Sequence, residues 1–229
     1  MKLVFHILIC FIPFIALLSG CKKILEEKPK TFVSPDAFYT SPSAYELTVI
    51  GIYRTIPSTL GANNWLSRES FSDIIGTVSG AYEQGLPVYQ NNHQPFFYNV
   101  RALWSNHYAI VKDANFIIKK IENATILTDA QKNSYTAEAR FLRAYAYFQL
   151  VQLFGDVSLR TDPLEDLTNV QIGRSPQQDV YNLIIDDLKF AETNLPKDAP
   201  TIGRVYKLVA TALLAKVYLT MAGNPLNQT

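Results

Sequence analysis

The chain has 229 residues, which is enough for one domain with a substantial hydrophobic core or for part of a larger one. Its 21 basic and 20 acidic residues give a formal net charge of +1, so it lacks the basic excess that nucleic-acid-binding proteins usually carry. Aromatic residues are plentiful, with 13 Tyr and 13 Phe, and Tyr in particular suits surfaces that contact amphipathic partners.

The first twenty residues have the pattern of a secretory signal. Lys2 is followed by a long, almost unbroken apolar run, and small residues come directly before Cys21. The sequence Leu-Ser-Gly-Cys at positions 18–21 resembles a bacterial lipobox, in which the Cys becomes the lipidated first residue of the mature protein. A membrane-spanning helix is the alternative, because the apolar run approaches the roughly 17–25 residues that a span needs. Since Pro13 interrupts that run, we predict a signal peptide over residues 1–20 and lipidation of Cys21.

Lipidation of Cys21 has consequences for the rest of the chain. The other cysteine, Cys10, would leave with the signal, so no thiol would remain for a disulfide or a metal site. Acyl chains anchor a protein to a membrane without spanning it. Residues 21–30, which contain the charged sequence KKILEEKPK, are predicted to form a solvated tether to a folded domain over residues 31–229.

The folded part is predicted to begin with a short helix and a long irregular segment. Over residues 42–56 apolar side chains recur at helical spacing, Ser41 is a suitable N-cap, and Pro57 is expected to end the helix. Residues 58–99 show no sustained periodicity and contain several Gly, Pro and Asn residues. A structureless segment of roughly 40 residues is unusual in a compact domain and is often functional.

Four long amphipathic helices are predicted in the remainder of the chain. They cover residues 101–122, 128–154, 176–194 and 204–221, where apolar residues recur at steps of three and four. The expected inward faces are Leu103, His107, Ile110, Ala114, Ile117 and Ile121; Phe141, Ala144, Tyr145, Phe148 and Val151; Val180, Ile184, Leu188 and Ala191; and Val205, Leu208, Ala212, Ala215 and Leu219.

Two of these helices begin with capping signals. Thr128 with Gln131, and Ser175 with Gln178, both have the spacing of a capping box. Gly155 is predicted to end the second helix.

The connections between the helices favour antiparallel pairs, the first helix with the second and the third with the fourth. Ala210, Ala212 and Ala215 would let the helix axes approach closely. We therefore predict an all-α fold of helical-repeat, tetratricopeptide-like pairs with long irregular loops. No clean repeat of about 34 residues is visible, so the likeness to tetratricopeptide proteins is architectural.

The predicted second helix carries a familiar sequence. The run EARFLRAYAYF at 138–148, with FGDV at 154–157, resembles the central signature of the SusD/RagB family. Further blocks fit the family in order and extend the likeness over nearly the whole chain: Leu25 to Pro29, Asp36 to Tyr39, Trp104, Tyr108, Ile110, Asn115, Arg174, Ser175, Val180, Tyr181, Ile184, Asp187, Leu188, Ala191, Leu195, Pro196, Gly203, Arg204, Ala210, Ala212 to Ala215, Tyr218 and Leu219. Trp104, Tyr108 and Asn115 match structural positions of the family, so they are expected to pack.

The resemblance implies a surface-exposed, lipid-anchored outer-membrane protein of a Gram-negative bacterium. Such proteins are not enzymes and need no cofactor. They bind glycans or other nutrients and pass them to a partner, a SusC-like TonB-dependent transporter, on which they sit as a lid. Family members are usually much longer than this chain. The resemblance therefore implies that residues 31–229 are the N-terminal part of such a fold, and that much of the ligand site would come from the remainder.

Charged residues and histidines give no sign of catalysis or metal binding. Glu138, Arg140 and Arg143 share one predicted helix, where such charges more often cap or pair with neighbouring helices than act as acids and bases. Without a second carboxylate in a cleft, no catalytic residue is predicted. His107 falls on a helical stripe and is expected to pack in the core, which leaves only His93 in the irregular segment and hence no metal site.

Ligand contact is predicted in the irregular segment. Sugars present hydroxyl edges, which Asn, Arg and Asp can hydrogen-bond, and flat ring faces, on which aromatic side chains can lie. The residues predicted to bind ligand on this basis are Asn63, Asn64, Trp65, Arg68, Asp73 and Tyr82, and Tyr89 offers a further platform. Alternatively, Trp65 anchors the segment onto the helical core.

Nutrient capture for an outer-membrane transporter is thus the leading hypothesis. A lipid-anchored helical scaffold that binds protein partners and no small ligand is the alternative from another class. A lipid-anchored hydrolase is the weakest, because no catalytic pair is recognisable.

Overall fold

The computed structural model describes residues 35–60, 98–163, 171–223 and 226. The chain divides into two compact units, residues 1–38 and 39–229. Helix α2 (Pro35–Phe38) lies in the first unit and the other described helices lie in the second. These are α3 (Pro42–Tyr53), α4 (Ile56–Leu60), α7 (Tyr98–Glu122), α8 (Asp129–Phe154), α9 (Gln177–Asn194) and α10 (Lys207–Ala222). The predicted signal peptide, Cys21 and the tether lie outside the described residues.

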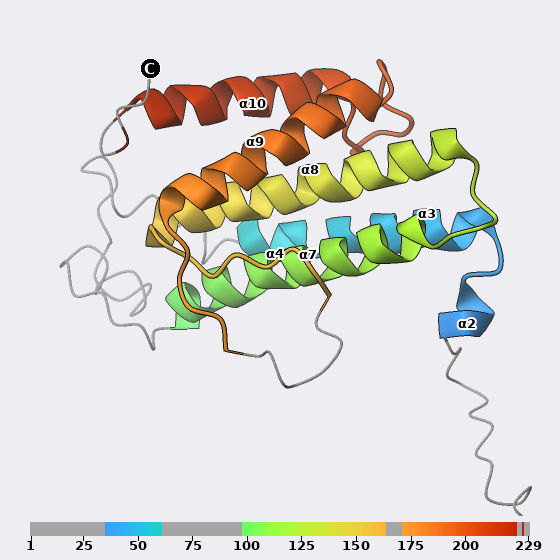
Figure 1. Cartoon of the computed structure of the whole chain (residues 1–229), viewed down its shortest axis with the longest axis horizontal. Coiled ribbons are helices and arrows are strands. Elements are labelled where there is room, and N and C mark those ends of the chain that lie inside the picture. The colour runs from blue at the N-terminus through green and yellow to red at the C-terminus, as the bar shows by residue number, and fades with distance from the viewer. Residues whose placement is uncertain (1–34, 61–97, 164–170, 224–225, 227–229) are drawn as a thin grey trace, which may run out of the picture. The chain divides into compact units, whose positions relative to one another are not determined.

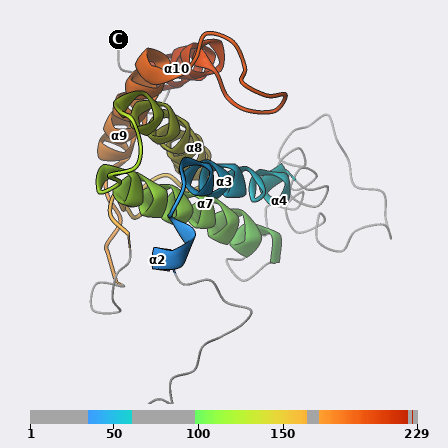
Figure 2. The same ribbon diagram turned by 90° about the vertical axis from the view of Figure 1, so that its right-hand side faces the viewer.

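The predicted all-α fold is confirmed. Across the described residues every regular element is a helix, and an isolated β-bridge joins Val157 and Ser175. Figure 1 shows α7, α8, α9 and α10 side by side in chain order, each running opposite to the one before it. Helices α3 and α4 lie against this row, with α3 in contact with both α7 and α8 (Figure 2). The expected antiparallel pairs are present, and α8 packs as closely against α9 as against α7.

Helix α8 forms the centre of the core because it has neighbours on three sides. It contacts α7, α9 and α3, and side chains around most of its circumference are buried. Tyr147, Phe148 and Leu142 are among the largest fully buried side chains. Burying such a side chain contributes about 1.5–3 kcal/mol relative to leaving it exposed. The inward faces predicted for the first three long helices are confirmed, with Tyr145 half-buried at the edge.

The ends of α8 follow the sequence signals. The Thr128 hydroxyl accepts from the Gln131 backbone N–H, and the Gln131 side chain accepts from the Thr128 backbone N–H, which completes the capping box. Gly155 ends the helix with φ of +68°, a left-handed conformation in which glycine is least strained.

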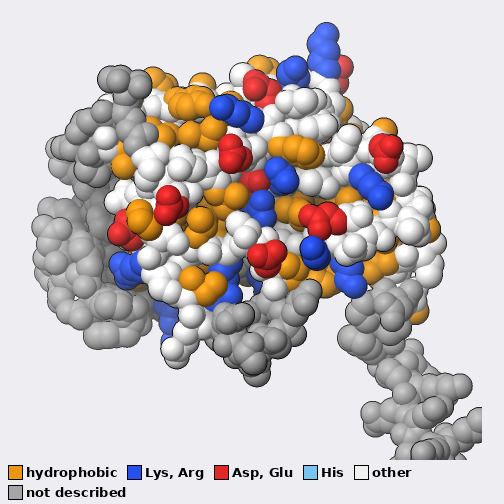
Figure 3. Space-filling model, in the orientation of Figure 1, with side chains coloured by type: hydrophobic (Ala, Val, Ile, Leu, Met, Phe, Trp, Pro, Cys, Tyr) orange, Lys and Arg blue, Asp and Glu red, His pale blue; other side chains and the backbone are white. Residues whose placement is uncertain are grey.

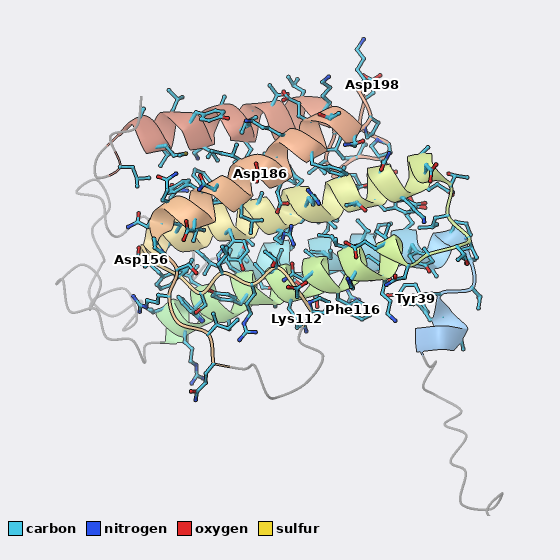
Figure 4. All side chains as sticks on the ribbon, in the orientation of Figure 1. Tyr39, Lys112, Phe116, Asp156, Asp186 and Asp198 are labelled. Carbon is cyan, nitrogen blue, oxygen red and sulfur yellow. The ribbon has the colours of Figure 1, made fainter. Side chains whose placement is uncertain are left out.

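The capping box predicted for α9 is wrong. Pro176 occupies the N-cap position, and Gln178 donates to Asn182 instead of reaching back to the helix start. The free backbone N–H of Gln177 is satisfied by the carboxylate of Asp156, at 3.1 Å, which comes from the segment that follows α8 (Figure 4). A partner 21 residues away in sequence replaces the local cap.

Two boundaries near the irregular segment also differ from the prediction. Helix α3 ends at Tyr53, and Pro57 lies in the first turn of α4. Backbone N–H groups in a first turn have no intrahelical acceptor, so a proline is tolerated there. Helix α7 begins at Tyr98, so both ends of the segment predicted as irregular are helical.

Of the inward face predicted for the fourth helix, Val205 is buried as expected, but the other four residues are wrong. Leu208 and Leu219 are 64% and 76% exposed, and Ala212 and Ala215 are exposed as well. The buried face of α10 carries Ala210, Leu214, Val217 and Met221. Because α10 is apolar around most of its circumference, both sets satisfy helical spacing and the pattern cannot choose between them.

No helix in the part of the chain that the structure describes is both long enough and apolar enough to cross a membrane.

Candidate functional site

The residues predicted to bind ligand lie outside the described part of the chain. This holds for Asn63, Asn64, Trp65, Arg68, Asp73 and Tyr82, and also for Tyr89 and His93. The structure does describe the helices that flank this segment, α4 before it and α7 after it. These two helices pack against each other, and the Asn106 side chain donates to the Ser58 carbonyl oxygen at 3.2 Å. The two helices on either side of residues 61–97 therefore lie together in the fold.

An aromatic cluster lies near the start of α7. The ring of Trp104 is 4.8 Å from that of Tyr108 and meets Phe154 of α8 edge-on at 5.1 Å. Tyr108 in turn lies edge-on to the buried Tyr147. These side chains join α7 to α8, which agrees with the packing role expected for Trp104 and Tyr108.

Two tyrosine hydroxyls, one from α7 and one from α8, hold the segment that follows α8 by hydrogen bonds to its backbone. Tyr108 donates to the Ser158 carbonyl oxygen at 2.8 Å. Tyr147 donates to the Arg160 carbonyl oxygen at 2.8 Å and accepts from the Arg160 backbone N–H at 2.7 Å. Burial raises the pKa of Tyr147 above its usual range, so its hydroxyl stays protonated as a donor. The Asn115 amide adds a third contact to this segment, at 3.0 Å from the Arg160 carbonyl oxygen.

A buried ion pair connects three helices beneath that segment. Arg143 of α8 donates two hydrogen bonds of 2.8 Å to the carboxylate of Asp187 on α9, and a third of 2.7 Å to Asn115 of α7. Burial raises the pKa of Asp187, while the hydrogen bonds from Arg143 oppose that rise. Arg140 lies 3.8 Å from the same carboxylate and places its guanidinium over the ring of Phe190.

A second charged cluster connects the segment before α10 to α3 and α8. Arg204 donates two hydrogen bonds to the buried carboxylate of Glu138, at 3.1 and 2.5 Å, and also pairs with Glu46. The hydroxyl of Tyr53 donates to Glu138 at 2.9 Å and accepts from the Val205 backbone N–H at 3.2 Å.

Electrostatics in this second cluster keep the guanidinium of Arg204 charged. Burial lowers the pKa of Arg204, but its hydrogen bonds to Glu138 and Glu46 outweigh that effect and the pKa is raised overall. Burial and the nearby Glu138 charge raise the pKa of Tyr53. Both oxygens of Glu138 are thus occupied by structural partners, so the carboxylate is not free to act as a general acid or base.

The interhelical pairing expected for Glu138, Arg140 and Arg143 is confirmed. The same is true of the core position of His107, which is fully buried and has its Nδ1 2.6 Å from the Leu103 carbonyl oxygen. A carbonyl oxygen can only accept, so Nδ1 carries the proton. No group of three or more His, Cys, Asp and Glu suited to a metal occurs in the described residues.

Sequence reasoning missed some partners in these clusters. Asp187 lies on the buried face of α9, three residues after Ile184 and next to Leu188. An acidic residue on an apolar stripe signals a buried partner, and that signal was available in the sequence. Glu46 and Tyr53 gave no such signal, because Arg204, which pairs with Glu46, and Val205, whose N–H donates to Tyr53, lie about 150 residues further along the chain.

An apolar groove of about 480 Å³ opens between α3, α4, α8 and α10. Its lining consists of Tyr53, Ile56, Phe141, Leu142, Tyr145, Gly203, Val205, Val209, Ala212, Leu213 and Lys216. The hydroxyl of Tyr53 is already engaged by Glu138. The groove therefore offers few groups to hydrogen-bond sugar hydroxyls and suits apolar side chains better.

Comparison with known proteins assigns the chain. The SusD-like family model, described as starch-binding and associating with the outer membrane, matches residues 45–219. A SusD-like protein of Bacteroides ovatus is 35% identical over 221 residues, which cover 90% of this chain and 38% of that protein. The curated relatives that the chain matches are much longer, since it spans only 38–42% of their length.

Solved structures share the fold. A laminarin-binding SusD-like protein has 26% identity and a TM-score of 0.70, over 80% of this chain and 41% of that chain. A structure solved with a xylogluco-oligosaccharide has 28% identity and a TM-score of 0.67, over 79% of this chain and 35% of that chain. The resemblance that the sequence carries in its second long helix is thereby confirmed. The chain belongs to the SusD-like family, whose members are described as starch-binding proteins that associate with the outer membrane.

Proposed function

We propose that the protein captures glycans at the bacterial surface and delivers them to a partner TonB-dependent transporter of the SusC type. The observation that carries this proposal is the family match over residues 45–219, together with solved relatives that bind laminarin or contain a xylogluco-oligosaccharide. In this proposal Cys21 bears the lipid that anchors the protein to the outer membrane. The chain acts as a binding protein and not as an enzyme.

The ligand site is proposed to include the segment between α4 and α7. Trp65 would lie against a sugar ring, and Asn63, Asn64, Arg68 and Asp73 would hydrogen-bond its hydroxyls, with Tyr82 as a second platform. Two features of the frame support this assignment. The flanking helices are held together by packing and by the bond from Asn106 to Ser58. The described groove, by contrast, is too apolar to hold a sugar by hydrogen bonds.

Affinity electrophoresis of the full-length protein in gels containing laminarin, xyloglucan or starch tests the ligand class. Retardation by at least one of these polysaccharides, and none in gels without polysaccharide, is the expected result. A protein that no glycan retards, but that co-purifies with other surface proteins, would favour the scaffold alternative.

The proposed partner and address need separate experiments. A tagged copy isolated from the bacterium that encodes it should bring down a TonB-dependent transporter, and a copy with Cys21→Ala should lose the membrane anchor. Protease treatment of intact cells should remove the wild-type protein if it faces outward. Survival of the protein under that treatment would contradict the surface location.

A further inference from the structure

An arginine lies beside the aromatic cluster near the start of α7. Arg101, Trp104 and Tyr108 follow one another at steps of three and four residues, so they share one face of the helix. Arg101 is exposed, and the two aromatic residues are partly exposed. Figure 3 shows Lys and Arg side chains, in blue, over this end of α7. The helix thus presents a positive charge next to two aromatic rings.

A second arginine approaches this face from the chain just before α9. The residue after Arg174, Ser175, donates its backbone N–H to the Val157 carbonyl oxygen at 2.9 Å and so forms the isolated β-bridge. The residue after Val157 is Ser158, whose carbonyl oxygen accepts from the Tyr108 hydroxyl at 2.8 Å. These backbone contacts place Arg174, which is exposed, close to Tyr108.

A third arginine is held by the segment that follows α8. The backbone N–H and carbonyl oxygen of Arg160 are both bonded to the Tyr147 hydroxyl, at 2.7 and 2.8 Å, so its side chain extends from a fixed point. Burial raises the pKa of Tyr108, and the positive charges of Arg160 and Arg174 oppose that rise. Both guanidinium groups therefore lie within electrostatic range of the Tyr108 hydroxyl. The arginine face comprises Arg101, Arg160, Arg174, Trp104 and Tyr108.

The charges of the arginine face differ from those that hold the helices together. Arg143 and Arg204 are paired with buried carboxylates. Arg101 and Arg174, by contrast, form no ion pair with any carboxylate of the described residues. A guanidinium group only donates hydrogen bonds, and its planar fork matches the oxygens of an anionic group. Neighbouring cations repel, and an anion between them relieves that repulsion. The arginine face therefore suits an anion better than neutral hydroxyls.

We propose that the arginine face binds an acidic group of the captured glycan, either the carboxylate of a uronic acid or a sulfate ester. Arg101 comes only a few residues after residues 61–97, the segment proposed to contact sugar. One glycan chain then meets both, with its neutral rings on that segment and its acidic group on the arginine face. The inference rests on the proposed glycan capture and adds the chemical class of the ligand.

Titration calorimetry of the full-length protein tests this inference with three defined probes. Oligogalacturonides carry carboxylates, carrageenan oligosaccharides carry sulfate esters, and laminarin oligosaccharides are neutral. The test variant combines Arg101→Ala with Arg174→Ala, two exposed positions at which the fold should tolerate the change. The matched control combines Lys189→Ala with Lys207→Ala, which removes two exposed positive charges from α9 and α10.

We expect at least one acidic oligosaccharide to bind wild type and control equally, and to bind the arginine variant at least about tenfold more weakly. Raising NaCl from about 50 mM to about 500 mM should weaken that binding and leave any laminarin binding unchanged. The probe that binds distinguishes a carboxylate from a sulfate ligand.

Other results would count against the arginine face. Binding of laminarin alone would overturn this inference while glycan capture stands, and binding of no oligosaccharide would overturn both. Acidic binding that falls equally in the arginine variant and the control would show an effect of overall charge and would overturn the inference. Acidic binding that falls in neither variant would place the acidic group elsewhere, with the same consequence.

Discussion

Helices α8 and α10 are both rich in apolar residues, yet the structure treats them differently. Helix α8 has neighbours on three sides, and its buried charges, Glu138 and Arg143, are paired with residues of other elements. Around α10 one side is packed and the other shows leucine and alanine to solvent. Apolar content alone therefore does not tell a central helix from an edge helix. Paired buried charges join α8 to its neighbours, whereas the exposed face of α10, made of Leu208, Ala212, Ala215 and Leu219, carries no charge.

The largest effect is expected at the ion pair between α8 and α9. Asp187→Ala leaves Arg143 buried without its carboxylate, and removing one partner of a buried pair typically costs about 3–5 kcal/mol. The free energy of unfolding, measured by urea denaturation, should fall by that amount. The neighbouring Asp186→Ala, on the exposed side of the same helix, is the matched control and should change it little.

The same site allows a sharper comparison. In the double variant Arg143→Met with Asp187→Leu both charges are gone, and replacing a buried pair by apolar residues is often close to neutral. The double variant should therefore be more stable than Asp187→Ala. If it is less stable, the pair itself, and not only the penalty for an unpaired charge, stabilises the seam.

A smaller effect is expected at the second charged cluster. Arg204→Ala removes the hydrogen bonds to Glu138 and Glu46 but leaves Tyr53 donating to the buried Glu138 carboxylate, so we expect a loss of about 1.5–3 kcal/mol, the usual contribution of bonds to charged groups. Lys207→Ala, three residues later and exposed, is the control. Equal denaturation midpoints for the two variants would show that this cluster does not hold α3 and α8 together.

The capping box of α8 should give a still smaller change. Thr128→Ala removes the side-chain acceptor for the Gln131 N–H and should cost about 1 kcal/mol. Thr128→Ser keeps that acceptor and should restore most of the lost stability. A Ser variant as unstable as the Ala variant would argue that the methyl group, and not the cap, matters.

The smallest effect is expected on the exposed face of α10. In the 229-residue chain Leu219→Ala should change the free energy of unfolding by less than about 0.5 kcal/mol, because an exposed leucine makes few contacts. Val217→Ala, two residues earlier on the buried face, should cost more. Similar losses for both variants would contradict the difference between the two faces of α10.

How much the sequence predicts depends on how local the interaction is. The presence of the four long helices and the Thr128 cap were predicted correctly, because spacing and capping are decided within a few residues. The cap of α9 was missed because Asp156 lies far from Gln177 in sequence. The face of α10 could not be chosen, since two apolar stripes fit the same helix and only the neighbours decide between them. The ligand-binding residues remain a prediction, because they fall outside the described residues.

The central claim is that the helices have a structural role and that the segment between α4 and α7 binds sugar. Isothermal titration of the full-length protein with laminarin or xyloglucan oligosaccharides, for wild type, Trp65→Ala and Phe116→Ala, tests it most directly. Phe116 is the control because it is a partly exposed aromatic residue on α7, outside that segment. We expect Trp65→Ala to weaken binding by about tenfold, or roughly 1.4 kcal/mol, with an unchanged unfolding temperature and with Phe116→Ala behaving as wild type. Wild-type affinity in Trp65→Ala, or an equal loss in both variants, would contradict the claim.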